Sequence, residues 1–132
     1  MTKEQLRQIV EAGEGITTEF KKASFELPKN ILETVCAMLN RRGGHIVLGV
    51  TDDGVVEGVI DDAIQGMKNN FVSAVNDVRQ LNPKFYLAIN DFVIFSQTVL
   101  HIYVPESSQV HAFNGRIFDR NEDGDFDITN NP

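Results

Sequence analysis

Three acidic side chains, Glu14, Glu19 and Asp52, have the chemistry of a divalent-cation site and could converge in the fold. The two glutamates flank the entry to a short predicted strand, and Asp52 follows a second predicted strand that could lie beside the first. Metal-assisted cleavage of a phosphodiester needs two or three carboxylates that converge on Mg²⁺ or Mn²⁺. Asp53 is the alternative to Asp52 in the same turn. The structural alternative is that Glu19 pairs with Lys21 or an arginine and that the aspartates only shape their turn.

Basic residues supply a second candidate site, in which side chains would bind phosphate: Lys21, Lys22, Arg41 and Arg42. The two arginines precede Gly43-Gly44, where arginine could hold a phosphate bidentately while the glycine backbone permits close approach. Arg120 would join this face if the last predicted strand lies alongside. The structural alternative is that the arginines stabilise the negative end of a helix dipole.

Two further patterns carry weaker signals. The segment 119–127 has oxygen donors at positions 1, 3, 5, 7 and 9 of a calcium loop and glycine at position 6, but position 12 is Asn130 instead of glutamate. An exposed acidic loop is the alternative. His45, His101 and His111 lie far apart and show no zinc-ligand spacing.

The charge distribution limits nucleic-acid hypotheses. The net charge is −7, and residues 51–132 hold five Lys/Arg against thirteen Asp/Glu. An acidic chain repels phosphate at long range, so nucleic-acid contact needs a local basic face or other parts of a longer protein.

Helices and strands that could position these residues follow from apolar periodicity and turn chemistry. We predict helices over 3–12, 28–40 and 63–79. We predict strands over 17–21, 45–50, 55–59, 85–89, 91–104 and 116–118, with turns at 51–54 and 90–91. The strand 45–50 is almost continuously apolar, which is typical of a central strand buried on both faces.

The fold expected from this order is α/β in the α+β sense. It has one domain over 1–118, with a mixed central sheet of about five to six strands and two to three helices packed on it. Residues 119–132 read as an acidic loop or linker toward a missing C-terminal region. No apolar run is long enough to span a bilayer, so we expect a cytoplasmic protein that does not enter a membrane.

The ordered motifs resemble a known family. They are Glu14-Gly15-Ile16-Thr17-Thr18-Glu19-Phe20-Lys21, Asn40-Arg41-Arg42-Gly43-Gly44, Ile46-Val47-Leu48-Gly49-Val50-Thr51-Asp52-Asp53-Gly54, Glu57-Gly58-Val59, Val104-Pro105-Glu106-Ser107-Ser108 and Ile117-Phe118-Asp119-Arg120. Together they are similar to the Schlafen-type, Alba-like family of DNA-binding domains. The resemblance implies a small α/β domain, often the N-terminal part of bacterial transcriptional regulators or divergent ATPases. In eukaryotic Schlafen relatives a similar domain forms an RNA-cleaving core, whose carboxylates correspond to Glu14, Glu19 and the aspartate of the following turn.

The leading prediction from the sequence is a non-catalytic DNA-binding domain of a bacterial transcriptional regulator, needing no cofactor and favouring DNA over RNA. Its contact face would be Lys21, Lys22, Arg41, Arg42 and Arg120. The alternative is an endoribonuclease that uses Glu14, Glu19 and Asp52 with Mg²⁺ or Mn²⁺. A third hypothesis is a protein-interaction or homo-oligomerisation module. The first two require the glutamate strand, the diarginine corner and the aspartate turn to compose one surface.

Overall fold

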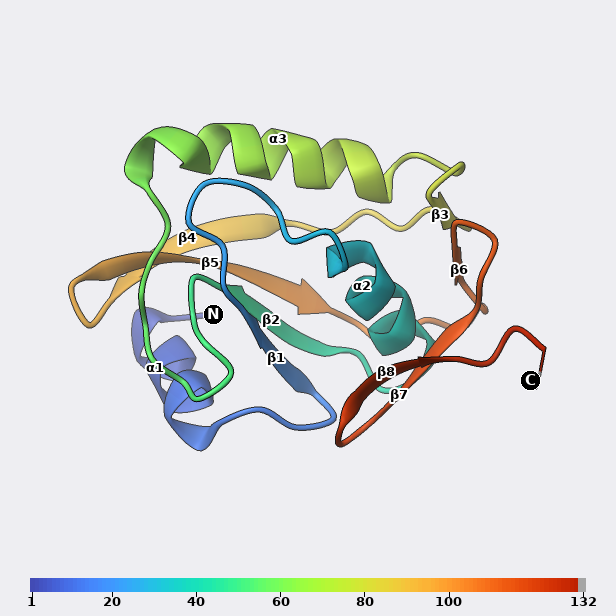
Figure 1. The fold of residues 1–132 in the computed structure, drawn as a ribbon, viewed down its shortest axis with the longest axis horizontal. Helices are drawn as coiled ribbons and strands as arrows, with labels where there is room; N and C mark the ends of the chain where they lie inside the picture. The colour runs from blue at the N-terminus through green and yellow to red at the C-terminus, as the bar shows by residue number, and fades with distance from the viewer. Residues whose placement is uncertain (131–132) are drawn as a thin grey trace.

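A four-stranded sheet in the order β1-β2-β5-β4 organises the computed structural model, which describes residues 1–130 (Figure 1). Its strands are β1 (Thr18–Lys21), β2 (Gly44–Leu48), β4 (Ile89–Ile94) and β5 (Gln97–Val104). β1 runs parallel to β2, and the other pairs are antiparallel. The α+β class is confirmed, and the apolar run of β2 lies inside the sheet as predicted. The remaining strands form two-stranded sheets, β3 (Leu81–Asn82) with β6 (Ala112–Phe113) and β7 (Phe118–Asn121) with β8 (Gly124–Asp127).

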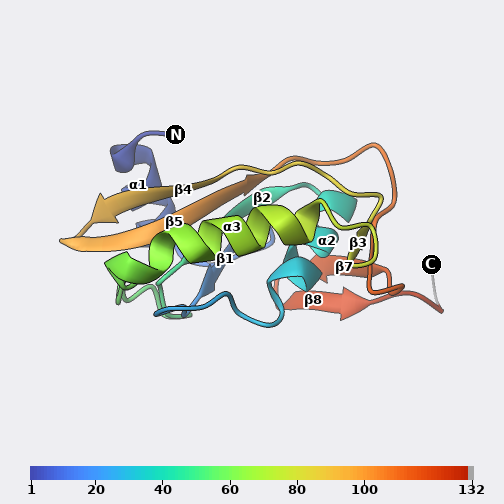
Figure 2. The same cartoon turned by 90° about the horizontal axis from the view of Figure 1, so that it is seen from above.

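Helices cover the two faces of the sheet unequally (Figure 2). α2 (Ile31–Asn40) and α3 (Ile64–Val75, entered through the 3₁₀ turn Asp61–Ala63) lie on one face, and α1 (Lys3–Ala12) lies on the other. Side chains alternate along β2, so that Ile46 belongs to the larger core under α2 and α3 while Val47 belongs to the smaller core under α1. No helix among residues 1–130 is long and apolar enough to cross a membrane.

The connection between α2 and β2 needs its two glycines. Gly43 has φ +72°, and a Cβ there would lie 2.2 Å from the carbonyl oxygen of Val104. A Cβ on Gly44 would lie 2.5 Å from the carbonyl oxygen of Thr17. The close approach that the sequence suggested for a phosphate is therefore an approach to neighbouring backbone.

Two predicted strand arrangements were wrong. Residues 55–59 form no strand, and only an isolated bridge joins Val50 to Val56. The reason is that β1 and β5 already occupy both edges of β2. The turn predicted at 90–91 lies inside β4, and β4 includes only Ile89 of the strand predicted over 85–89. The chain reverses instead at Phe95 and Ser96, whose φ angles are +48° and +62°.

Residues 118–127 form the β7–β8 hairpin against α2, in a segment expected to be a loop or linker. Two side chains of this hairpin, Phe118 and Arg120, are buried. The last two residues of the predicted linker, 131 and 132, lie outside the described residues. The third predicted helix ends at Val75, four residues earlier than expected.

A candidate metal centre

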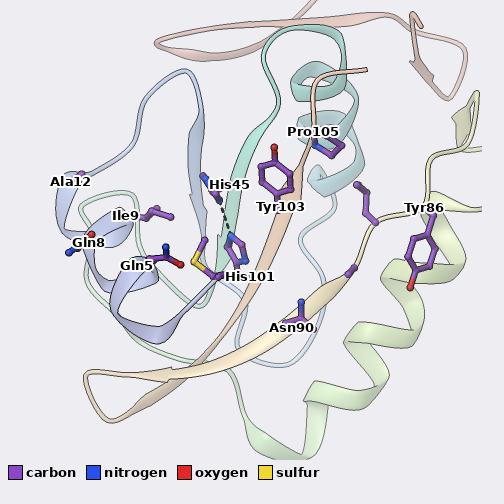
Figure 3. A pocket seen from close by; sticks show the side chains of 13 residues that line it. Gln5, Gln8, Ile9, Ala12, His45, Tyr86, Asn90, His101, Tyr103 and Pro105 are labelled. Atoms are coloured by element: carbon purple, nitrogen blue, oxygen red, sulfur yellow. Dashed lines mark hydrogen bonds between the residues drawn. The ribbon is translucent and has the colours of Figure 1, made fainter. Parts of the chain in front are cut away.

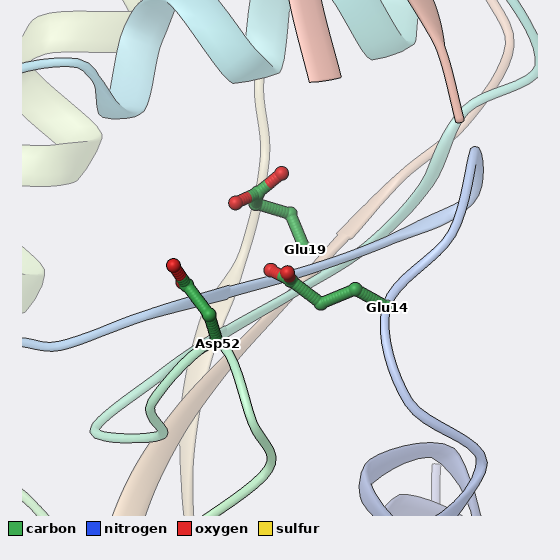
Figure 4. Close-up of side chains that lie close together, drawn as sticks. All are labelled: Glu14, Glu19 and Asp52. Carbon is green, nitrogen blue, oxygen red and sulfur yellow. The ribbon is translucent and has the colours of Figure 1, made fainter. Parts of the chain in front are cut away.

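Glu14, Glu19 and Asp52 converge at one point (Figure 4). Each offers a carboxylate oxygen, and the three oxygens lie within 4.8 Å of one another. Glu14 lies in the loop after α1, Glu19 in β1, and Asp52 in the turn after β2. The parallel pairing of β1 with β2 brings the turn after β2 beside the β1 edge of the sheet. Among residues 1–130 this is the one group of three His, Cys, Asp or Glu side chains close enough to share a cation.

The three carboxylates are held to different degrees. Glu14 Oε2 accepts a hydrogen bond of 2.8 Å from the backbone N–H of Phe20, which folds the intervening turn back on itself. Glu19 Oε1 accepts a hydrogen bond of 2.9 Å from Arg120. Asp52 is exposed and has no side-chain hydrogen bond to any described residue. The cluster thus has two anchored carboxylates and one that can adjust.

Charge repulsion and partial withdrawal from water perturb the Glu14 carboxyl. Desolvation is the largest cause, and the charges of Glu19 and Asp52 add to it, while the N–H of Phe20 opposes it. The net result raises the pKa of Glu14 to about 6. A hard divalent cation among these oxygens would offset the repulsion, and an all-oxygen donor set suits Mg²⁺ or Mn²⁺.

Arg120 fixes the turn between the two glutamates. Its side chain is 2% exposed. The guanidinium donates to backbone carbonyl oxygens of Gly15 at 2.9 Å, Ile16 at 2.8 Å and Thr18 at 3.3 Å, and it pairs with both Glu19 and Asp125. This is the pairing of Glu19 with an arginine that the structural alternative foresaw. Because all these bonds are internal, Arg120 acts on the site by positioning Glu19.

The other basic side chains of the predicted contact face divide into two pairs. Lys21 is buried and donates to Asn30 at 3.1 Å, and Arg41 forms a two-pronged pair with Asp119 at 2.9 and 2.5 Å. Lys22 and Arg42 are exposed. Lys22 lies 4.0 Å from Glu57, and Arg42 forms no ion pair with any residue in 1–130. Two of the five predicted contact residues, Lys22 and Arg42, therefore face solvent, and Lys22 does so beside the carboxylate of Glu57.

The carboxylates of the calcium-loop pattern are separated in the β7–β8 hairpin. Asp119 pairs with Arg41, Asp125 with Arg120, and Asp127 with Arg116. These ion pairs account for three of the five acidic residues in 119–127 as structural contacts.

One constellation was missed at the level of sequence. His45 Nδ1 lies 2.9 Å from His101 Nε2, and the two rings stack with their centroids 5.2 Å apart. They are 56 positions apart in the chain. The antiparallel pairing of β2 with β5 brings them together, and no local spacing could have indicated it.

Comparisons with known proteins agree with this architecture. Residues 14–129 match the model of the family described as Schlafen, AlbA_2. No curated protein matches the chain.

Two solved structures share the fold. A protein from Corynebacterium diphtheriae superimposes with a TM-score of 0.68 at 18% identity, covering 95% of this chain and 26% of its own. The N-terminal domain of a Nitrosomonas europaea protein described as related to the DNA helicase RecG superimposes with a TM-score of 0.60 at 23% identity. That match covers 80% of this chain and 74% of the other. The chain thus spans about a quarter of the length of the first neighbour.

Proposed function

Since this chain belongs to the Schlafen AlbA_2 family and gathers three carboxylates at one point, we propose that it is a metal-dependent endoribonuclease domain. The observation that carries the proposal is the approach of the Glu14, Glu19 and Asp52 oxygens to within 4.8 Å. Like charges at this distance repel one another, and Arg120 compensates Glu19 alone, so a cation bound among the three oxygens would relieve the remaining repulsion. The choice of RNA rests on the resemblance of the Glu14-to-Glu19 motif to the RNA-cleaving Schlafen core.

Each residue has a separate part in this proposal. Glu14, Glu19 and Asp52 would hold Mg²⁺ or Mn²⁺. When bound, such an ion polarises a phosphodiester and lowers the pKa of water. Arg120 holds Glu19 in place beside the cluster, and the N–H of Phe20 orients Glu14. Asp52, exposed and unbonded, is free to adjust its carboxylate to the ion and to an arriving strand.

In this proposal the two exposed basic side chains, Lys22 and Arg42, contact the phosphates of the nucleic acid. The exposure of these two side chains also favours the second candidate function, DNA binding without cleavage. That function, and a role in a bacterial transcriptional regulator, remain predictions. Lys21, Arg41 and Arg120 have internal partners, so their removal would act through the fold more than through lost phosphate contacts.

The decisive experiment compares two neighbouring aspartates. Structured RNA is incubated with the wild-type chain, with Asp52→Asn and with Asp53→Asn, in Mn²⁺ and in EDTA. Both aspartates are exposed in the same turn, but only Asp52 belongs to the cluster. We expect cleavage by the wild type and by Asp53→Asn in Mn²⁺, and none by Asp52→Asn or in EDTA.

Other outcomes contradict the proposal in distinct ways. RNA that stays intact with the wild type in Mn²⁺, while a gel shift with DNA persists, would favour binding alone. RNA cleavage that is retained by Asp52→Asn would show that the carboxylate cluster does not take part in the reaction. A single-stranded and a duplex DNA of the same sequence, run in parallel, test the choice of RNA.

A further inference from the structure

A groove of about 920 Å³ lies on the face of the sheet that carries α1 (Figure 3). α1 is 10 residues long, and the apolar core beneath it includes Val47 of β2. The same face of β2 continues to His45, which lines the groove beyond this core. The groove is bounded by α1 on one side and by the segment leading into β4 on the other.

Aromatic rings form the floor of this groove. His45 lies opposite Tyr103 in the β2–β5 pairing, and their ring centroids are 5.5 Å apart. His101 continues the row by stacking on His45 at 5.2 Å with an interplanar angle of 28°. Tyr103 is 57% exposed and Tyr86, at the rim, is 71% exposed. Ring faces that the core does not use are therefore open to a flat ligand.

The histidine pair also presents a fixed hydrogen-bonding pattern. Burial lowers the pKa of both imidazoles, that of His101 to about 4, so both rings are neutral at pH 7. A neutral ring carries one proton, and one proton is shared in the contact between His45 Nδ1 and His101 Nε2. Whichever ring donates, the two remaining nitrogens offer one donor and one acceptor. No residue in 1–130 bonds to either nitrogen, and both rings line the groove, His45 half-buried and His101 3% exposed.

The lining is almost without charge. Apart from the α-ammonium of Met1, its polar groups are imidazoles, phenols and the amides of Gln5, Gln8 and Asn90. Phosphates and carboxylates would find no cationic side chain here. A flat, neutral heterocycle with donors and acceptors on its edge fits both the rings and the polar groups.

We propose that this groove binds an unpaired nucleobase, with its face on Tyr103 and His45 and its edge toward the histidine pair and Asn90. The proposal goes beyond the nuclease function and does not depend on it, because no groove residue belongs to the carboxylate cluster. A free nucleoside and an unpaired base within a strand present the same chemistry, so the experiment separates them.

The test follows the histidine and tyrosine ring signals of the full chain by NMR during titration with adenosine or uridine, with ribose as the blank. A second titration uses a single-stranded oligonucleotide and its duplex, in EDTA to prevent cleavage. We expect nucleosides, but not ribose, to shift the ring signals of His45, His101 and Tyr103. Single strands should shift the same signals at lower concentration, and the duplex should not. Shifts with the strand alone would assign the groove to bases held in a strand.

Substitutions at two exposed aromatic residues, Tyr103 and Phe25, distinguish a loss of stacking from a loss of folding. Tyr103→Leu should weaken binding about tenfold or more, while Tyr103→Phe, which keeps the ring, should bind nearly as the wild type does. Phe25→Leu is the matched control, because Phe25 is 62% exposed and lies outside the groove. Asp52→Asn should bind bases normally even if cleavage is lost, which separates this proposal from the nuclease function.

Three results would overturn the proposal. The first is an absence of ring shifts with both nucleosides and strands. The second is wild-type binding by Tyr103→Leu. The third is broadening of the groove signals with protein concentration alone, which would assign the groove to a second copy of the chain.

Discussion

Cation affinity should depend on pH through Glu14. Its raised pKa of about 6 means that about one-tenth of the Glu14 carboxyl is ionised at pH 5 and about nine-tenths at pH 7. A cation that needs this carboxylate must displace its proton, so the apparent Mn²⁺ affinity should fall about tenfold from pH 7 to pH 5. A glutamate with the ordinary pKa of 4.5 would lose only about 1.3-fold over the same range. The size of the loss in Mn²⁺ affinity therefore measures how far the pKa of Glu14 is raised.

The assay is titration with Mn²⁺ at pH 5, 6 and 7, following free Mn²⁺ by electron paramagnetic resonance. Glu14→Gln removes the titrating group, so it should bind Mn²⁺ more weakly at pH 7 and show a much flatter pH profile. Glu11→Gln, an exposed glutamate of α1 outside the cluster, should keep the wild-type profile. Equal wild-type affinity at pH 5 and pH 7 would refute the reasoning, and so would a Glu14→Gln profile as steep as that of the wild type.

The same pKa has a consequence for stability with the opposite sense. Because the folded chain holds the Glu14 proton more tightly than the unfolded chain, the stability that this group contributes is complete below about pH 4.5 and is lost as pH rises through about 6. Bound Mn²⁺ should offset that loss. The melting temperature should therefore rise more on adding Mn²⁺ at pH 7 than at pH 5.

Three further predictions concern the framework of the two sites. Arg120→Met leaves two carboxylates and three carbonyls without their buried donor, and it should lower the free energy of unfolding in urea by about 3–5 kcal/mol, with Arg120→Lys less damaging. Gly43→Ala should lower the free energy of unfolding by more than about 2 kcal/mol, because its Cβ would lie 2.2 Å from a carbonyl oxygen. Gly66→Ala within α3 is the control: its Cβ would meet nothing within 4 Å, and it should raise the free energy of unfolding by up to about 1 kcal/mol. Because burial lowers the pKa of His101 to about 4, the stability that this group contributes is complete above about pH 6.5 and is lost as pH falls through about 4, by roughly 3 kcal/mol. The urea midpoint of the wild type should therefore be lower at pH 4.5 than at pH 7, and His101→Gln should remove this contribution to the difference.

Local signals in the sequence were sufficient for the elements that depend on their own residues. The predicted helix 3–12 has the predicted bounds, because Thr2 and Gln5 form a reciprocal capping box at its start and Gly13 ends it with φ +88°. The unbroken apolar run of β2 likewise predicted a central strand.

Choice of partner could not be predicted in the same way. Residues 55–59 have strand composition next to a good turn, yet β2 pairs with β1 and β5 instead. Those pairings place β2 inside the sheet, where one face belongs to the core under α2 and α3 and the other to the core under α1.

For the carboxylate cluster, the sequence predicted the residue types but only part of their context. Glu14, Glu19 and Asp52 stand out by type and by resemblance. The role of Arg120 depends on the β7–β8 hairpin packing against α2. The acidic composition of this segment predicted a loop instead of a hairpin. The His45–His101 pair had no local signal, because it exists only through the register of β2 and β5.

The contact between Arg120 and Glu19 spans 101 positions, and this separation sets an order of events during synthesis. All three carboxylates leave the ribosome well before the guanidinium that orders their turn. A nascent chain that stops before β7 therefore carries the three carboxylates without the contact that arranges them. Tight cation binding would thus report that translation has passed Asp125 and that the hairpin has docked.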